Sequence, residues 1–285
     1  MEYIKLMRPK HYIKNFLIFL PLLFSGKLLS LSNILITLGG VICFSLVASS
    51  IYIINDIKDR EKDRQHKTKC KRPIASGKIS VRNALIFMFF LLIIVALLVI
   101  VLDFSLLSIG FLGLYFLLNL FYSLGLKDVP LVDIIILVSG FVIRVLFGAS
   151  LLAITVSNWL YLTVIAISFY LGLGKRRNEI VKNGSKTRKV LKYYTKEFLD
   201  KNMYMFLTMT IIFYSLWTTD LSIVSKSNNL LIWTVPLVII IAMKYSMDIE
   251  GESDGDPVEV IVHDKVIMAL GLVYVLCLIM ILYVL

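Results

Sequence analysis

Three aspartates that follow an apolar segment have a spacing that could support metal chemistry. Asp56, Asp59 and Asp63 are three and four residues apart. On a helix these offsets place side chains on one face, so the three carboxylates would form a single stripe. Repulsion makes such a stripe unfavourable unless a cation lies between the groups, and Mg²⁺ prefers hard oxygen ligands. The spacing therefore predicts a Mg²⁺ site, and a solvated charged loop is the alternative interpretation.

A run of Lys and Arg follows the aspartates and includes Lys71 and Arg72. Mg²⁺ that is held by carboxylates usually keeps coordination positions for phosphate oxygens. Lys and Arg side chains can bind the remaining charge of such a phosphate group. The combined pattern favours a metal–phosphate site.

The composition is that of a polytopic helical membrane protein. Hydrophobic residues make up 59% of the 285 residues, and the mean hydropathy is +0.86, well above the values of soluble domains. The three cysteines show no paired spacing, so the sequence indicates neither a disulfide framework nor a zinc site. Apolar runs long enough to span a membrane recur along the chain. The nine expected spans cover about 16–30, 33–54, 83–102, 104–124, 129–153, 159–174, 203–219, 230–247 and 266–285.

The distribution of positive charge predicts the orientation of these spans. If the N-terminus is cytoplasmic, all Lys and Arg residues except Lys27, Arg144 and Lys226 fall in or beside cytoplasmic segments. The positive-inside rule therefore supports nine helices, with the N-terminus inside and the C-terminus outside. The net charge of +11 follows from this asymmetry and requires no nucleic-acid partner.

The loops that carry charged candidate site residues all lie on the cytoplasmic side of this topology. We expect a single integral membrane domain over 1–285, with cytoplasmic cap loops at about 56–82 and 175–201. A multi-pass protein of the cell membrane with its active site facing the cytoplasm is the natural interpretation. A transporter would more often place functional residues at the midplane and show internal repeats.

Arg144 lies near the middle of an apolar span, where a bare guanidinium costs roughly 2.5–3.5 kcal/mol on insertion scales. Asp133 precedes it by eleven residues, close to three helical turns, so the two side chains share a face. They are too far apart to pair directly. Arg144 therefore faces either a cavity or an acidic group on another helix, and a structural role between helices is the alternative.

Charged residues also follow the sixth span and the eighth. Lys175, Arg176, Arg177 and Glu179 combine three cations with one carboxylate, which suits phosphate binding. Asp248 follows Tyr245 at a helix end and is a candidate site residue.

Tyr122 and Lys127 close the fourth span. Residue types alone favour an interfacial Tyr and a snorkelling Lys there.

These motifs together carry a resemblance to a known family. Asn55-Asp56-x-x-Asp59-x-x-x-Asp63, followed by Arg72-Pro73 and Gly77, resembles the first aspartate-rich motif of the UbiA-type intramembrane prenyltransferases. Four further segments resemble its decaprenyl-phosphate phosphoribosyltransferase branch, and the similarity covers essentially the whole chain: LMRPKHYIKN at 6–15, GFVIR at 140–144, GKRRNE at 174–179 and the DPVEVI run from Asp256. The chain departs from the aromatic-substrate members, which place a second aspartate-rich motif after the sixth span, because no Asp occurs from Gly172 to Leu199.

The resemblance implies an all-α nine-helix bundle and a transferase. Its reaction would move the 5-phosphoribosyl group from phosphoribosyl diphosphate to a polyprenyl phosphate, with Mg²⁺ as cofactor and release of diphosphate. Asp56, Asp59 and Asp63 would be the catalytic metal ligands, and the chain is compatible with a homo-oligomer. The expected substrate-binding residues are Lys14, Asn55, Lys71, Arg72, Tyr122, Lys127, Asp133, Arg144, Lys175, Arg176, Glu179, Tyr245 and Asp248.

Two other functions stay open at this point. One is an aromatic-acceptor prenyltransferase with a prenyl diphosphate donor, against which the missing second motif argues. The other is a non-catalytic lipid-phosphate transporter, which has little use for three carboxylates at its mouth.

Overall fold

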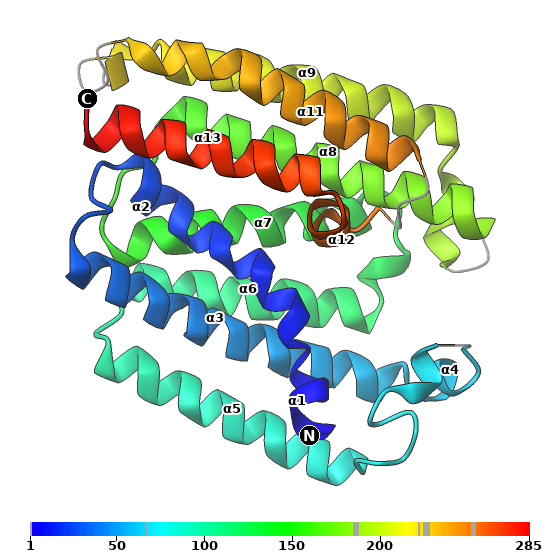
Figure 1. Cartoon of the computed structure of the whole chain (residues 1–285). Coiled ribbons are helices and arrows are strands. Elements are labelled where there is room, and N and C mark those ends of the chain that lie inside the picture. Colours follow the sequence, from blue (N-terminus) through cyan, green and yellow to red (C-terminus); the bar gives the residue numbers. More distant parts are fainter. Residues whose placement is uncertain (1, 67, 185–187, 222, 225–228, 252–254) are drawn as a thin grey trace. The chain divides into compact units, whose positions relative to one another are not determined.

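The computed structural model describes residues 2–66, 68–184, 188–221, 223–224, 229–251 and 255–285. All regular elements of these residues are helices, as expected (Figure 1). Six of the described helices are long and apolar enough to cross a membrane. The chain forms two compact units, one of Met1–Lys127 with Ile143–Ile154 and the other of Asp128–Val142 with Thr155–Leu285.

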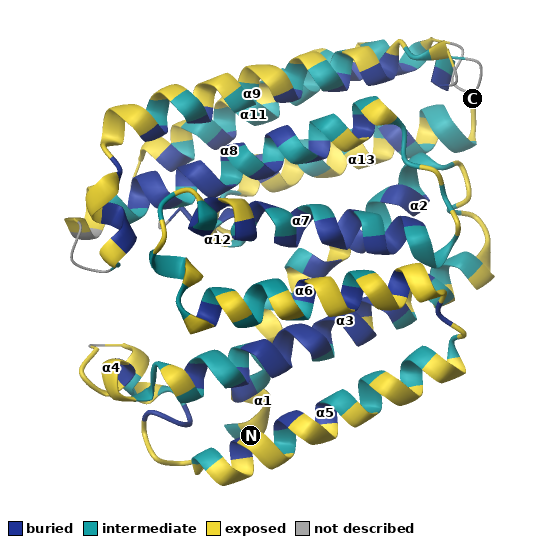
Figure 2. Cartoon of the chain, turned by 180° about the vertical axis from the view of Figure 1, so that it is seen from behind, coloured by how far each residue is buried: buried dark blue, intermediate teal, exposed yellow. Residues whose placement is uncertain are grey.

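The first unit is built around one long buried helix, α3. The apolar part of α3 is 61% buried, whereas that of α5 is only 17% buried and is largely exposed in Figure 2. Phe44 of α3 packs against Tyr115 and Phe147, with ring centroids 4.4 and 5.5 Å away. The elements of this unit are α1 (Glu2–Met7), η1 (Pro9–Phe19), α2 (Leu20–Phe24), α3 (Leu31–Lys58), α4 (Arg60–Arg64), η2 (Lys69–Lys71), α5 (Val81–Val101), α6 (Leu106–Leu124), η3 (Leu126–Asp128) and the second half of α7 (Val132–Leu151).

The second unit contains an antiparallel pair of long helices, α8 and α9. Stacked rings follow their interface, with Phe169 against Phe206 at 4.5 Å and Trp159 against Phe213 at 6.2 Å. As the residue number rises on α8 it falls on α9, which shows that the pair is antiparallel. The elements of this unit after the first half of α7 are α8 (Asn158–Asn183), η5 (Lys189–Tyr193), α9 (Lys196–Thr218), η6 (Leu230–Thr234), α11 (Val235–Glu250), α12 (Pro257–His263) and α13 (Lys265–Tyr283).

Most long helices begin at a polar residue that caps the first turn. The hydroxyl of Ser80 accepts a hydrogen bond from the Asn83 backbone N–H at the start of α5. Such a bond satisfies one of the free N–H groups at a helix N-terminus and typically contributes about 1 kcal/mol. The same device starts α3 at Ser30, α6 at Ser105, α8 at Ser157, α9 at Thr195 and α13 at Asp264.

A tight hairpin at Asp103 joins α5 and α6. α5 ends at Val101 and α6 begins at Leu106, and Asp103 has a left-handed backbone with φ of 48°. Asp tolerates this conformation better than most residues because its short polar side chain can bond locally.

Three of the nine expected spans are not among the six helices that are long and apolar enough to cross a membrane. The expected spans at 159–174 and 203–219 lie within α8 and α9, and α8 continues through the charged segment at 174–179. The expected span at 16–30 is divided between η1 and α2. The count of nine and the single membrane domain with its two cap loops stay predictions.

Gly148 of α7 lies close to the backbone of η1. A Cβ atom at this position would lie 2.0 Å from the carbonyl oxygen of Ile18 in η1. The Gly148→Ala substitution should therefore displace η1 and lower the free energy of unfolding by about 1–3 kcal/mol, measured by thermal unfolding in detergent. Gly110→Ala is the matched control, because nothing lies within 4 Å of a Cβ there. Equal stability of the two variants would contradict this packing.

Candidate active site

The first aspartate motif forms a buried charge cluster in the first unit. Asp56 and Asp63 are both only 3% exposed. Nη1 of Arg72 lies between their carboxylates, 3.0 Å from Asp56 Oδ1 and 2.6 Å from Asp63 Oδ2. Two of the three aspartates therefore converge on one guanidinium. Asp56 and Asp63 are seven residues apart, and Arg72 reaches them from a later loop.

A one-residue break in the helix falls at Asp59, between Asp56 and Asp63. α3 ends at Lys58 and α4 begins at Arg60, with Asp59 between them at φ −86° and ψ 5°. The carboxylate of Asp59 instead binds Nζ of Lys127, at 2.9 and 3.0 Å. The expected single stripe of three carboxylates is therefore wrong, because it assumed a continuous helix. Lys127, in contrast, lies beside the motif as the resemblance implies.

A compact turn brings Arg72 back to the carboxylates. The Ser76 N–H donates to the Arg72 carbonyl at 2.9 Å, and the Ile79 N–H donates to the Pro73 carbonyl at 3.0 Å. Gly77 closes the turn with φ of +78°, a conformation that favours glycine. Nε of Arg64 donates to the Ala75 carbonyl at 3.2 Å and ties this turn to α4.

Arg8 also binds this cluster, and sequence reasoning missed it. Its guanidinium donates to Asp56 and lies over the ring of Tyr52, 5.1 Å from the centroid. Burial lowers the pKa of Arg8, and the nearby Asp56 carboxylate opposes this shift. A left-handed backbone at Arg8, with φ of 56°, separates α1 from η1. The signal was present, since Arg8 directly precedes the helix breaker Pro9.

The donor set of this cluster suits Mg²⁺ together with a diphosphate. Within the described ranges, no three His, Cys, Asp or Glu side chains lie close enough to hold a metal by themselves. Asp56 and Asp63 nevertheless present two converging carboxylates, and Mg²⁺ commonly takes one or two carboxylates plus phosphate oxygens. Arg8, Arg72 and Lys127 add cations that can bind phosphate oxygens. The residues therefore fit a Mg²⁺–diphosphate group.

Arg144 is buried in the first unit between two aromatic rings. It is 5% exposed, and the centroids of Phe44 and Tyr115 are each 4.9 Å from its Cζ. Nε donates to Asn15 Oδ1 at 2.7 Å, and Nη2 donates to the Tyr115 hydroxyl at 3.1 Å. These contacts link η1, α6 and α7, which matches the structural alternative for this residue. Its role toward a substrate phosphate stays a prediction.

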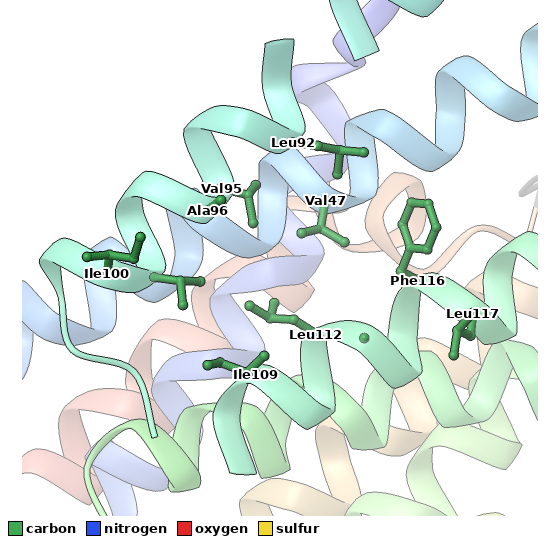
Figure 3. A pocket seen from close by; sticks show the side chains of 11 residues that line it. Val47, Leu92, Val95, Ala96, Ile100, Ile109, Leu112, Phe116 and Leu117 are labelled. Atoms are coloured by element: carbon green, nitrogen blue, oxygen red, sulfur yellow. The ribbon is translucent and has the colours of Figure 1, made fainter. Parts of the chain in front are cut away.

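An apolar groove lies between α5 and α6 of the first unit. It has a volume of about 570 Å³, and Figure 3 shows side chains of α5 and α6 that point toward one another across it, with Val47 of α3 between them. Val47 and Asp56 are nine residues apart, or about two and a half turns, so they project from opposite faces of α3. The groove can accept a hydrocarbon chain, on the face of α3 away from the aspartates.

A second charge cluster, in the second unit, is centred on Asp133 and Arg176. Both side chains are fully buried, and Nε of Arg176 donates to Asp133 Oδ2 at 2.7 Å. The Tyr194 hydroxyl donates to Asp133 Oδ1 at 2.6 Å, and burial together with this bond raises the pKa of Tyr194. Glu179 Oε2 accepts from Arg176 at 2.9 Å and pairs with Arg188 at 3.3 Å. This network joins α7, α8 and the segment around η5.

The remaining acidic segment folds against the charged end of α8. Nζ of Lys175 lies 3.0 Å from Asp256, which caps α12. A Cβ at Gly255 would lie 3.2 Å from the Gly174 carbonyl oxygen, so the chain crosses α8 closely there.

Asp248 is fixed within the same unit by a lysine on its own helix. Lys244 binds Asp248 and also Asp264, the latter at 2.5 Å. The Lys244 bond and the backbone N–H of Ile267 lower the pKa of Asp264. Tyr245, the residue after Lys244, is buried with its ring 5.7 Å from that of Tyr170.

Four other expected site residues lie in the first unit. Lys71 is exposed, whereas Lys14, Asn55 and Tyr122 are partly buried in η1, α3 and α6. Their roles stay predictions.

Comparison with known proteins identifies the family. The model of the UbiA prenyltransferase family matches residues 16–257. The chain is 33% identical to a decaprenyl-phosphate phosphoribosyltransferase of Corynebacterium glutamicum, over 99% of this chain and 86% of the relative. It is 32% identical to one of Mycolicibacterium smegmatis, over 95% and 89%. The chain therefore belongs to the UbiA prenyltransferase family, and it is a multi-pass membrane protein.

A solved structure supports the same fold. A UbiA homologue from Archaeoglobus fulgidus bound to GPP and Mg²⁺ matches with a TM-score of 0.71 and 20% identity, over 98% of this chain and 99% of that one.

The Asp133–Arg176 pair should be essential for folding, because both charges are fully buried. Arg176→Met leaves the Asp133 carboxylate without its cation, and losing one partner of a buried pair costs about 3–5 kcal/mol. The double variant Asp133→Leu/Arg176→Met should recover much of this loss in thermal unfolding. If the double variant is no more stable than Arg176→Met alone, the pair does not act as a structural unit.

Proposed function

We propose that the protein transfers the 5-phosphoribosyl group from phosphoribosyl diphosphate to a polyprenyl phosphate, in a Mg²⁺-dependent reaction that releases diphosphate. The observation that carries this proposal is the near-full-length similarity to two proteins named decaprenyl-phosphate phosphoribosyltransferase. The cluster of Asp56, Asp63 and Arg72 supports it, because its donor set suits a metal-bound diphosphate.

The proposed transfer requires the protein to bind both substrates and to stabilise the charge on the leaving diphosphate. The bond between ribose C1 and the diphosphate oxygen breaks, and its electron pair leaves with diphosphate. An oxygen of the acceptor phosphate forms the new bond to C1. Because this acceptor is already an anion, the reaction needs no strong general base.

The residues of the first cluster divide into metal ligands and phosphate ligands. Asp56 and Asp63 would hold Mg²⁺, with Asp59 and Asn55 as neighbours. When bound, Mg²⁺ stabilises the charge that develops on the leaving diphosphate. Arg8, Arg72 and Lys127 would donate to phosphate oxygens, as preorganised cations do in phosphoryl sites.

We propose that the predicted substrate residues outside this cluster also contact the donor or the acceptor. We assign Lys71 and Lys175, with Arg176, to donor phosphates. Glu179 and Asp133 then act on the substrate through Arg176, which they bind. For Lys14, Tyr122 and Arg144 we propose contacts to either phosphate, and for Tyr245 and Asp248 contacts to the donor.

The reaction and its metal site can be tested together. Purified protein with Mg²⁺ should convert labelled phosphoribosyl diphosphate and a polyprenyl phosphate into a lipid-soluble labelled product. Asp56→Asn and Asp63→Asn should each lower this activity on the order of a hundredfold or more, because a metal bridge contributes several kcal/mol to the transition state. Asp128→Asn is the control, since this carboxylate lies in η3 and outside the Asp56–Asp63–Arg72 cluster.

Two results would refute the assignment. Near-normal activity of both aspartate variants would show that the motif binds no metal. Consumption of geranylgeranyl diphosphate with an aromatic acceptor, without labelled ribose in the organic phase, would favour the prenyltransferase alternative.

We further propose the nine-helix topology in the cytoplasmic membrane, with the N-terminus and the active site on the cytoplasmic side. The charge asymmetry of the sequence supports it. Cysteines introduced at Leu29 and Lys192, both exposed, should be labelled from outside and from inside, respectively. Labelling of both positions from the same side of intact cells or inverted vesicles would contradict this topology.

A further inference from the structure

Arg72 holds the same two carboxylates that the proposed metal site of the first unit would use. Its Nη1 atom donates to Asp56 Oδ1 at 3.0 Å and to Asp63 Oδ2 at 2.6 Å. A single nitrogen of the guanidinium therefore satisfies both buried acids. A metal ion that takes these two carboxylates as ligands has to displace the guanidinium, because two cations repel each other at one bridging position.

The bridging guanidinium is also the most solvent-accessible member of this cluster. The side chain of Arg72 is 26% exposed, compared with 19% for Arg8 and 3–4% for Asp56 and Asp63. Arg176 of the second unit also binds two acids, but it is 0% exposed. A cation at the solvent edge can exchange partners without the desolvation penalty that fixes a fully buried one.

The backbone that carries Arg72 is held independently of its side chain. The Ser76 N–H donates to the Arg72 carbonyl at 2.9 Å, and the Ile79 N–H donates to the Pro73 carbonyl at 3.0 Å. Neither bond uses the guanidinium. The side chain can therefore leave the carboxylates while the turn keeps its shape.

Charge is balanced within this cluster by the protein itself. Lys127 binds both oxygens of Asp59, and Arg8 is a second cation on Asp56. Three motif carboxylates thus pair with three cations. A divalent cation alone would give the cluster an excess of positive charge, whereas a metal-bound diphosphate brings phosphate oxygens that a displaced guanidinium can bind instead.

We propose that Arg72 and Mg²⁺ compete for Asp56 and Asp63, so that the protein binds the metal tightly together with diphosphate and only weakly without it. In this exchange Arg72 leaves the carboxylates and donates to a phosphate oxygen. The inference rests on the metal site of the proposed function and adds how metal and diphosphate binding are coupled. Carboxylates that a guanidinium holds are available to a metal for only a fraction of the time, and the apparent Kd of the metal rises accordingly.

The test measures the Kd of Mn²⁺, a paramagnetic substitute for Mg²⁺, by EPR titration of the full-length protein in detergent. Arg72→Met should bind Mn²⁺ alone about tenfold more tightly than the wild-type protein, because no guanidinium has to be displaced. It should bind the complex of Mn²⁺ with inorganic diphosphate about tenfold more weakly, because the phosphate loses a charged donor.

A matched control accounts for the loss of one positive charge. Lys69 is an exposed residue of η2, three positions before Arg72 and outside the carboxylate cluster. Lys69→Met should keep both Kd values within about threefold of the wild-type values, because solvent and salt screen an exposed charge. If Arg72→Met and Lys69→Met bind Mn²⁺ alone equally tightly, the metal does not displace Arg72 and the proposal fails.

Thermal unfolding gives a second readout that needs no activity. Arg72→Met leaves two buried carboxylates without their shared cation, so it should unfold at a lower temperature than the wild-type protein. Mg²⁺ alone should restore most of this loss and should barely stabilise the wild-type protein. The double variant Arg72→Met/Asp63→Asn should be restored without metal. Equal stabilisation of the wild-type protein and Arg72→Met by Mg²⁺ would overturn the competition.

The wild-type protein provides a test even if Arg72→Met does not fold. It should bind the complex of Mn²⁺ with diphosphate at least about tenfold more tightly than Mn²⁺ alone. Equal affinity for the two would overturn the proposal.

These measurements use neither phosphoribosyl diphosphate nor a lipid, so their failure differs from failure of the proposed function. If the expected Mn²⁺ constants are found but no labelled lipid forms, the coupling holds and the transfer reaction is wrong. If labelled lipid forms but Arg72→Met has the Mn²⁺ constants of the wild-type protein, the reaction holds and the coupling is wrong.

Discussion

The structure depends on how charge is balanced within apolar surroundings. Asp56 and Asp63 are almost fully buried, and an isolated carboxylate in such a place would cost many kcal/mol. Arg72 bridges them, and Arg8 binds Asp56 as well. Arg8 reaches the cluster because the first helix ends before Pro9, and Arg72 reaches it because residues 72–79 form a compact turn. Both backbone features therefore place a cation beside the buried carboxylates.

The second unit meets the same requirement with different partners. Arg176 is fully buried and binds both Asp133 and Glu179, while Tyr194 supplies a further hydrogen bond to Asp133. Each of these groups has a hydrogen-bond partner within the network, which is the arrangement that rigidifies a core. This network explains how Arg176 can be fully buried within α8.

Local features of both units could be predicted from the sequence, whereas ion partners could not. Apolar runs predicted the six long helices, because such runs depend only on neighbouring residues. Asp56 and Asp63 were found from their spacing. The partners of Arg144 and Arg176, in contrast, are Asn15 and Asp133, which are 129 and 43 residues away in the chain. Tertiary packing determines such pairs, and no local pattern indicates them. The break at Asp59 was missed because helical spacing was assumed to continue.

Whether a buried polar group is satisfied then separates structural residues from candidate binding residues. Arg176 was expected to bind phosphate from its place in a cationic run, yet its guanidinium is already held by two carboxylates. The sequence indicated Tyr245 and Asp248 only by residue type and by their place at a helix end. Each has a buried oxygen without a hydrogen-bond partner. Since an unbonded oxygen costs stability, its retention requires a compensating ligand or water, whereas a closed network requires none. The network around Arg176 therefore accounts for the burial of that charge, whereas the unbonded oxygens of Tyr245 and Asp248 are not accounted for by protein contacts.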